Sequence, residues 1–325
     1  MGLIPLGHML GFDEVKIENA DTRNQNAVKW LEKEAAYSDM EVAETDTQVV
    51  IRGKTFVYVY SKKNGMFESL VFAGREYINR PTELNIWRAP TDNDMYAKME
   101  WKKAKYDEAY VRAYETDINQ SAEGVEIFVK TSMAAAAVQK ILDAEILWKI
   151  DCIGAITFSV HVVKDDEFPS LPRFGLRFFL NKQFEKITYF GMGPHESYRD
   201  KHQSTSHGLY RGKVREMHED YIMPQENGSH FDCDYVEIVN GQYGMAVASE
   251  KTFSFNASIY SQEELERAAH NYELEQSDST VLCIDYALNG IGSNSCGPVV
   301  MEQYRFDDTE FDFNIKVIPF VKAEK

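Results

Sequence analysis

Polar and hydrophobic residues alternate along several segments of this chain. Residues 156–162 read Ile-Thr-Phe-Ser-Val-His-Val, and residues 253–259 repeat the alternation. A period of two is typical of a β-strand with one buried face. Further β-rich segments lie at 48–54, 55–60, 66–70, 173–180, 281–286, 299–306 and 311–318.

Turn and helix signals complete this pattern. Asn64-Gly65 separates two of the β-rich segments, and because both residues tolerate positive φ the pair predicts a β-hairpin. Helices are few: one is predicted at 262–271, with Ser261 as its N-cap, and another at 96–110. Many strands with few short helices predict an all-β fold, a large antiparallel β-sandwich.

The chain divides into three parts. Residues 1–18 contain too few apolar side chains for a core and are interpreted as a single terminal strand. Residues 19–47 are polar and acidic around one short helical segment at 27–36, which predicts a linker. The β-rich body extends from 48 to 325. Either a fragment of a longer protein or a naturally separate small subunit fits this organisation.

The charge balance limits the partners of this chain. Its 325 residues include 35 basic and 52 acidic side chains, which gives a net charge of −17. A field of that sign repels nucleic-acid phosphates and anionic lipid surfaces, so we expect neither as a partner. No apolar run is long enough to span a bilayer, and the first residues lack the pattern of a signal peptide.

The four cysteines indicate a reducing compartment. Cys152, Cys233, Cys283 and Cys296 are scattered without a Cys-x-x-Cys pair, and the first and third lie in apolar segments. This spacing predicts buried free thiols rather than disulfides or a zinc site, and therefore a cytoplasmic protein. The histidines also lack the spacing of metal ligands, so no metal site is predicted.

Four motif segments carry most of the information about function. The first, 86–94, reads Ile-Trp-Arg-Ala-Pro-Thr-Asp-Asn-Asp. Its proline favours an extended residue before it and ends a strand, and the Asp and Asn side chains favour a turn. The others are 189–200 (Tyr-Phe-Gly-Met-Gly-Pro-His-Glu-Ser-Tyr-Arg-Asp), 224–228 (Pro-Gln-Glu-Asn-Gly) and 290–298 (Gly-Ile-Gly-Ser-Asn-Ser-Cys-Gly-Pro).

These four segments, in this order, resemble the C-terminal domain of glycoside hydrolase family 2 β-galactosidases, also called the small-chain domain or domain 5. The resemblance covers residues 48–325. It implies a two-sheet supersandwich of the galactose mutarotase type. It also implies that residues 1–18 are the last strand of a preceding immunoglobulin-like domain.

The resemblance implies a part in hydrolysing terminal β-D-galactosides such as lactose. A retaining glycosidase needs two carboxylates about 5–5.5 Å apart, and the family supplies them from a TIM barrel. Because this chain lacks the alternating β/α pattern of a barrel, we expect no catalytic residue in it and no hydrolysis by it alone.

The same resemblance defines the expected partners and cofactors. The partners are the β-galactoside, bound together with the rest of the enzyme, and the catalytic barrel domain or large subunit. A homo-oligomer is also compatible with the family. No cofactor is expected in this chain, whereas the resemblance implies Mg and Na ions in the parent enzyme.

By resemblance, the loop that leaves the first motif segment is a mobile rim of the sugar pocket. Its predicted substrate-binding residues are Asp92, Asn93 and Asp94. A second rim element, in the last motif segment, adds Asn294 and Cys296. Well-known family members have a tryptophan at the position of Cys296, where its indole forms an apolar platform for the sugar. A cysteine cannot stack on a sugar, so we expect a remodelled or wider mouth.

Other residues that match the family are expected to hold the motif segments together. Glu226 is interpreted as a carboxylate that anchors loops through backbone N–H groups or a nearby arginine. His230 stands where the family usually has arginine, so a bidentate pair is not expected there. The structural residues of the motifs are Trp87, Arg88, Glu196, Glu226 and Asn227.

Two alternatives to a β-galactosidase part stay open on the sequence alone. One is an aldose epimerase of the galactose mutarotase type, which uses a His and a Glu in a sandwich cleft. The other is a non-catalytic carbohydrate-binding module. The unpaired N-terminal strand favours the β-galactosidase interpretation, because a complete epimerase has no use for it.

Overall fold

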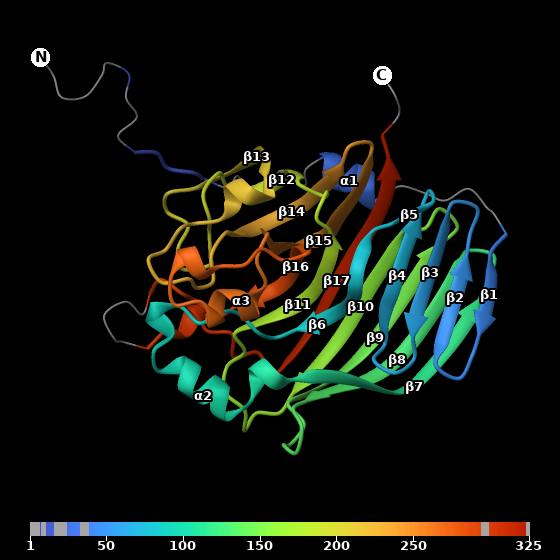
Figure 1. The fold of residues 1–325 in the computed structure, drawn as a ribbon, viewed down its shortest axis with the longest axis horizontal. Coiled ribbons are helices and arrows are strands. Elements are labelled where there is room, and N and C mark those ends of the chain that lie inside the picture. Colours follow the sequence, from blue (N-terminus) through green and yellow to red (C-terminus); the bar gives the residue numbers. More distant parts are fainter. Residues whose placement is uncertain (1–6, 8–10, 16–24, 33–38, 294–298, 323–325) are drawn as a thin grey trace, which may run out of the picture.

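The computed structural model describes the chain except residues 1–6, 8–10, 16–24, 33–38, 294–298 and 323–325 (Figure 1). Strands dominate the described residues and form a five-stranded and a twelve-stranded sheet. The strand pairs within both sheets are antiparallel. The predicted all-β antiparallel fold is therefore confirmed.

The small sheet has the strand order β1-β2-β3-β4-β5. The predicted hairpin at Asn64-Gly65 joins β3 to β4, and Gly65 has the positive φ (74°) that such a turn requires. The strands are β1 (Glu41–Glu44), β2 (Gln48–Arg52), β3 (Phe56–Ser61), β4 (Met66–Phe72) and β5 (Arg75–Glu76).

The large sheet has the order β13-β12-β14-β15-β17-β10-β9-β8-β7, and a branch of β16, β11 and β6 leaves it at β15. The branch arises because β15 pairs with β17 through Tyr243–Ala248 and with β16 through Ser254–Ser258. The bounds are β6 (Ile78–Asn85), β7 (Tyr110–Gln120), β8 (Gly124–Ala134), β9 (Leu142–Asp151), β10 (Ile156–Lys164), β11 (Arg173–Asn181), β12 (Lys186–Gly193), β13 (Ser206–Lys213), β14 (Ser229–Asn240), β15 (Tyr243–Ser258), β16 (Ser279–Leu288) and β17 (Glu310–Val321).

Short helices lie between the strands. Ser261 caps α3 as predicted, since its hydroxyl accepts the Glu264 N–H (3.2 Å). The predicted helix 96–110 is shorter because Lys105 has φ of +57° and separates α2 from η2. The α-helices are α1 (Gln25–Leu31), α2 (Ala97–Lys103) and α3 (Gln262–Arg267); the 3-10 helices are η1 (Asp92–Asp94), η2 (Tyr106–Glu108), η3 (Val214–Met217), η4 (Asn271–Glu273) and η5 (Glu302–Tyr304).

The predicted strand at 299–306 is wrong. That segment contains η5, and two of its backbone carbonyls bond to a neighbouring loop and to an arginine side chain of the segment itself. The Gly290 N–H donates to Tyr304 O (2.8 Å), and Arg305 Nε donates to Val300 O (2.8 Å). With these carbonyls engaged, the segment closes a loop.

In the described part of residues 19–47, the structure has α1 and β1. Helix α1 packs on the outer face of the large sheet, where the Trp30 ring lies 5.0 Å from the Phe320 ring. Residues 11–15 have no regular secondary structure, and Glu14 Oε2 accepts the His207 N–H (2.8 Å). The domain boundaries stay predictions.

The main hydrophobic core lies between the two sheets. The Trp148 ring of β9 packs 5.0 Å from Phe67 of β4 and 4.7 Å from Phe158 of β10. Its Nε1–H donates to Gly65 O (3.0 Å), so the aromatic core also holds the β3–β4 hairpin. In Figure 1 the small sheet covers the β8–β9 part of the large one.

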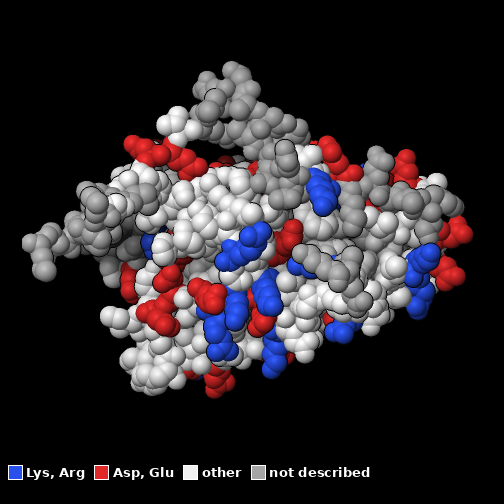
Figure 2. All heavy atoms as spheres, turned by 90° about the horizontal axis from the view of Figure 1, so that it is seen from above, with Lys and Arg blue, Asp and Glu red and all other residues white. Residues whose placement is uncertain are grey.

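Strand β11 positions the site because it is buried on both faces. It lies between β6 and β16, and only its last residue is partly exposed. Charged residues that are buried on this strand therefore need a counter-ion. On the molecular surface seen from above, a group of basic side chains lies near the middle, with acidic side chains beside it and along the margins (Figure 2). No helix of the described residues is long and apolar enough to cross a membrane.

Candidate functional site

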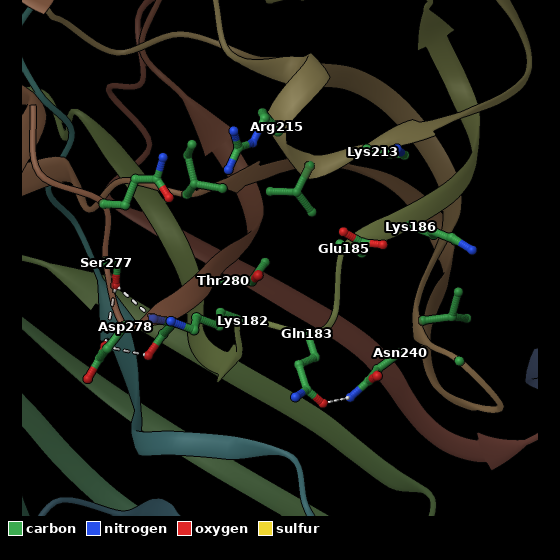
Figure 3. Close-up of a pocket in the computed structure, with 16 residues that line it drawn as sticks. Lys182, Gln183, Glu185, Lys186, Lys213, Arg215, Asn240, Ser277, Asp278 and Thr280 are labelled. Atoms are coloured by element: carbon green, nitrogen blue, oxygen red, sulfur yellow. Dashed lines mark hydrogen bonds between the residues drawn. The ribbon is translucent and has the colours of Figure 1, made fainter. Parts of the chain in front are cut away.

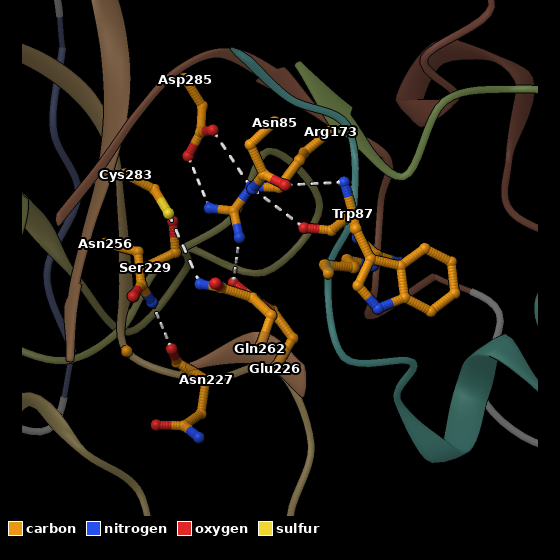
Figure 4. A network of polar contacts seen from close by, with 12 residues as sticks. Asn85, Trp87, Arg173, Glu226, Asn227, Ser229, Asn256, Gln262, Cys283 and Asp285 are labelled. Carbon is orange, nitrogen blue, oxygen red and sulfur yellow. Dashed lines mark hydrogen bonds and ion pairs between the residues drawn. The ribbon is translucent and has the colours of Figure 1, made fainter. Parts of the chain in front are cut away.

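Two polar features lie at opposite ends of β16. A cavity opens at the start of the strand (Figure 3), and a buried polar network surrounds Asp285 near its end (Figure 4). The four motif segments meet at the second feature, which makes it the candidate site.

Trp87, the second residue of the first motif segment, lies inside the protein. Strand β6 ends at Asn85, whose side chain makes two bonds to the Trp87 backbone. Asn85 Nδ2 donates to Trp87 O (3.0 Å), and Asn85 Oδ1 accepts the Trp87 N–H (3.1 Å). The Trp87 indole is buried, and its Nε1–H donates to Glu266 Oε2 (3.2 Å). This residue therefore anchors the segment to α3.

Arg88 and Asp94 form a fully buried ion pair. Arg88 Nη2 lies 2.7 Å from Asp94 Oδ1 and 2.9 Å from Oδ2, and both side chains are 0% exposed. Asp94 Oδ2 also accepts the Thr91 N–H (2.9 Å) and hydroxyl (3.1 Å), which folds residues 91–94 into η1. The expected turn is therefore built around the ion pair, and Asp94 lies inside the protein.

The same arginine joins this turn to the segment after β16. Its guanidinium donates to the carbonyl oxygens of Asn289 and Gly290. Asn93, on the partly exposed side of the turn, donates from Nδ2 to Ile291 O (2.6 Å). The first and last motif segments are thus in direct contact.

Asp200, the last residue of the second motif segment, binds the same loop. Its Oδ1 accepts the Ile291 N–H (3.0 Å), and Oδ2 accepts those of Gly292 and Ser293 (2.9 Å each). Glycine at 290 permits this approach, since a Cβ there would lie 2.5 Å from Asp200 Oδ2. Burial disfavours the charge on Asp200, but the three N–H groups outweigh it and hold the pKa of this carboxyl below its ordinary value.

The third motif segment, 224–228, lies beside the first. The Glu226 N–H donates to Ala89 O (3.1 Å). The Asp92 N–H donates to Gln225 Oε1 (3.0 Å), and Gln225 Nε2 donates back to Asp92 Oδ2 (3.3 Å). Asp92 itself is exposed, so its carboxylate stands at the edge of the assembled loops.

Arg173 of β11 ties the third segment to the sheet (Figure 4). Its Nε and Nη2 donate to Asp285 Oδ1 (3.1 Å) and Oδ2 (2.6 Å), and Nη1 donates to Glu226 Oε1 (3.1 Å). All three side chains are buried. Burial raises the pKa of the Glu226 and Asp285 carboxyls, while Arg173 opposes the rise.

Glu196 and Asn227 connect the second and third segments. Glu196 accepts the Gly228 N–H (2.8 Å) and bonds to Lys201 and the Tyr221 hydroxyl. Asn227 Oδ1 accepts the Glu219 N–H (3.0 Å), and its Nδ2 donates to Gln225 O (2.9 Å). These contacts close the loops into one unit, with both residues buried.

His230 is a neutral, buried histidine next to this unit. Its ring lies between those of Tyr189 (4.5 Å) and Phe255 (5.0 Å). Its Nδ1 is 3.2 Å from Met192 O, which makes Nδ1–H the donor. Burial lowers the pKa of His230 from 6.5 to about 4.

The buried carboxylates of this arrangement hold its loops in place. Five carboxylates of the site are at most 9% exposed, and each accepts from a cation or from N–H groups, whereas Asp92 is exposed. Within the described part of the chain, no group of three or more His, Cys, Asp or Glu side chains is arranged to hold a metal ion. The engaged carboxylates are Asp94, Glu196, Asp200, Glu226 and Asp285.

The structure places eight of the ten residues that the sequence singled out within or beside this unit. The other two, Asn294 and Cys296, lie outside the described residues. Sequence reasoning did not assign roles to Arg173, Asp200 or Asp285. A usable signal existed for Arg173, because an arginine within a continuous apolar segment requires a buried partner.

Exposed apolar side chains lie close in sequence to two motif segments. Met95 and Met223 directly adjoin the segments that contain Asp92 and Gln225, and three more lie within five residues of them. Their exposed fractions range from 47% to 93%, well above those of ordinary core residues. They are Met95, Tyr96, Met99, Ile222 and Met223. Grouped apolar exposure of this kind marks an interaction surface.

The fold defines a sandwich of the galactose mutarotase class. The structure is similar to that of galactose 1-epimerase from Lactobacillus acidophilus NCFM, with a TM-score of 0.50 at 7% sequence identity. The likeness covers 89% of this chain and 100% of the epimerase. At this identity it concerns the fold alone, and it agrees with the predicted supersandwich.

Sequence comparison then gives the family. Residues 52–317 match the family described as beta galactosidase small chain, and the chain belongs to that family. It is 40% identical to a β-galactosidase of Actinobacillus pleuropneumoniae over 97% of its length and 35% identical to one of Staphylococcus xylosus over 95%. It spans only 30% and 31% of those two relatives. The chain thus corresponds to the small-chain part of a larger enzyme, as the four motif segments predicted.

Replacing Asp94 by Asn will strongly destabilise the protein. The change leaves the Arg88 charge buried without a counter-ion, so we expect the free energy of unfolding to fall by about 3–5 kcal/mol in urea denaturation. Asp92→Asn is the matched control, since Asp92 is exposed and should lose less than about 1 kcal/mol. Equal losses in the two variants would contradict the assigned role of the ion pair.

Acidification will destabilise the fold through His230. The unfolded histidine has its pKa near 6.5 and the folded one near 4, so the unfolded state binds more protons between these values. Stability is therefore present above pH 6.5 and is lost as pH falls, by about 3 kcal/mol near pH 4. In urea titrations at several pH values, the free energy of unfolding of His230→Gln should decrease less steeply with falling pH than that of wild type. Parallel curves would show that this histidine is not responsible.

Proposed function

We propose that this chain is the part of a family 2 β-galactosidase that completes the pocket for terminal β-D-galactosides such as lactose. The catalytic glutamates belong to a TIM barrel outside this chain. The observation that carries the proposal is the convergence of the four motif segments around Arg88 and Asp94. Membership of the small-chain family, at about 30% of the relatives' length, supports it.

Asp92 and Asn93 form the pocket rim in this proposal. Asp92 is exposed and Asn93 partly exposed, and both are held by bonds to buried loops. Preorganised polar groups of this kind position a polyol without large entropic cost. Asp94 contributes indirectly, because its buried carboxylate holds the turn that carries them. Asn294 and Cys296 complete the rim by resemblance.

The exposed apolar side chains around the rim are the contact with the barrel-bearing part. Met95, Tyr96 and Met223 would lose their exposure in that interface, which favours association. Methionine suits such a contact because its flexible thioether adapts to a partner surface. The barrel's carboxylates would then lie across the rim from Asp92 and Asn93.

Other expectations complete the proposal. The free, buried thiols of Cys152, Cys233 and Cys283 support a cytoplasmic enzyme. By resemblance, the parent enzyme uses Mg and Na ions, and no cofactor is expected in this chain. The alternative of an aldose epimerase has the likeness of fold as its support.

A chimera tests the division of labour. The purified chain alone should not hydrolyse o-nitrophenyl β-galactoside and should not accelerate mutarotation of galactose. The same chain should restore hydrolysis when it replaces the matching 30% of the Actinobacillus pleuropneumoniae enzyme. Hydrolysis by the isolated chain would contradict the proposal, mutarotation would establish the epimerase, and tight galactoside binding by the isolated chain would establish a carbohydrate-binding module.

Substituting Asn93 by Ala in that chimera tests the rim. Loss of the bond to Ile291 O frees the turn, so we expect KM for lactose to rise about tenfold, the equivalent of one hydrogen bond. Asn119→Ala, an exposed change on β7, is the matched control and should leave the kinetics unaltered. Unchanged kinetics in a folded Asn93→Ala chimera would remove this residue from the pocket.

A further inference from the structure

A second candidate site is the cavity at the start of β16, which the proposed function does not use (Figure 3). Its volume is about 970 Å³, at the upper end of the range for ligand sites. Six residues of strand, about 20 Å, separate Ser279 at its edge from Asp285 of the first site. The walls are the β11–β12 turn, the end of β13 with η3, the β14–β15 turn and the segment leading into β16.

The lining of this cavity is basic in a strongly acidic chain. Four cationic side chains and two carboxylates line it, so the local sum is +2 in a chain of net charge −17. A concave surface with locally positive charge concentrates anions. The cations are Lys182, Lys186, Lys213 and Arg215, and the carboxylates are Glu185 and Asp278.

None of these four cations forms an ion pair with a carboxylate in the described part of the chain. The contrast with Arg88 and Arg173 is clear, because each of those is bound by a buried carboxylate. In a chain with a large excess of acids, four cations that line one cavity and form no ion pair with a described carboxylate leave charge available for a ligand.

Two of the cations stand opposite each other on neighbouring strands. Lys186 of β12 and Lys213 of β13 are direct cross-strand partners. Cross-strand partners project from the same face, and like charges at such a pair destabilise the sheet. An anion bound between the two amino groups would convert this repulsion into attraction.

The remaining walls supply uncharged hydrogen-bonding groups. Gln183 Oε1 accepts from Asn240 Nδ2 (3.2 Å), which fixes both amides on one wall. In Figure 3 this pair lies on the wall opposite Arg215, and Lys186 and Lys213 lie on a third side. Amides suit sugar hydroxyls, whereas lysine and arginine suit a phosphoryl group.

We propose that this cavity binds a phosphate monoester of a polyol, of the size of a hexose phosphate. The phosphoryl group is held by Lys186, Lys213 and Arg215, and the hydroxyls face Gln183 and Asn240. Inorganic phosphate shares the phosphoryl chemistry but leaves most of the volume empty, so it binds more weakly. The site is independent of galactoside hydrolysis.

Calorimetric titration of the full chain tests the site with three probes: glucose 6-phosphate, inorganic phosphate and glucose. We expect saturable binding in that order of affinity. A Lys186→Ala/Lys213→Ala variant should bind glucose 6-phosphate at least about tenfold more weakly, because charge-assisted bonds are lost. Glu185→Gln should bind it more tightly, since a repelling carboxylate is removed. Lys54→Ala, which removes one exposed lysine outside the cavity, should have no effect.

Thermal unfolding supplies an independent readout. Lys213→Ala removes one partner of the lysine pair, so in phosphate-free buffer its Tm should be higher than that of wild type. Glucose 6-phosphate should raise the Tm of wild type more than that of the variant. Absence of saturable binding, equal loss of binding in Lys54→Ala, or equal affinity for glucose and its phosphate would overturn the proposal. Equal affinity for both phosphates would overturn its polyol part.

Discussion

The burial of the Arg88 guanidinium is the constraint on which the candidate site depends. A charge with no exposed surface is tolerated only when a carboxylate and further acceptors surround it. Asp94 meets that need only if residues 91–94 fold back on themselves, and the carbonyl oxygens of Asn289 and Gly290 must also face the guanidinium. The conformations of two loops from distant parts of the sequence thus follow from one buried charge.

A second buried arginine, in the sheet, also requires buried counter-ions. Arg173 cannot reach solvent from the fully buried β11, so Asp285 of β16 and Glu226 share its charge. The Glu226 N–H also bonds to Ala89 O, which couples the two arginine centres. Asp92 and Asn93, the proposed rim residues, are therefore bonded to loops that the two arginine centres hold.

Sequence patterns predicted the parts of this fold that depend on local order. Alternation located β10, and Asn64-Gly65 located the hairpin. The segment 299–306 was wrongly predicted as a strand because it is apolar; it forms a loop that bonds to Gly290. The pairing of Arg173 with Asp285, 112 residues apart, has no local signal either. The motif segments identified the loops that form the candidate site. Which of their side chains face inward depends on non-local packing: Asp94 is buried, whereas Asp92 is exposed.

Strand β17 has a consequence for how this sheet assembles. It lies between β15 and β10, so residues 310–321 join the β7–β10 half of the large sheet to the half that contains β12–β15. During synthesis both halves are complete in sequence before this strand leaves the ribosome, yet each exposes an unpaired edge until it arrives. Open edges of this kind invite pairing with other chains. Chaperone protection of the nascent chain would therefore matter most in the interval before residue 321 emerges.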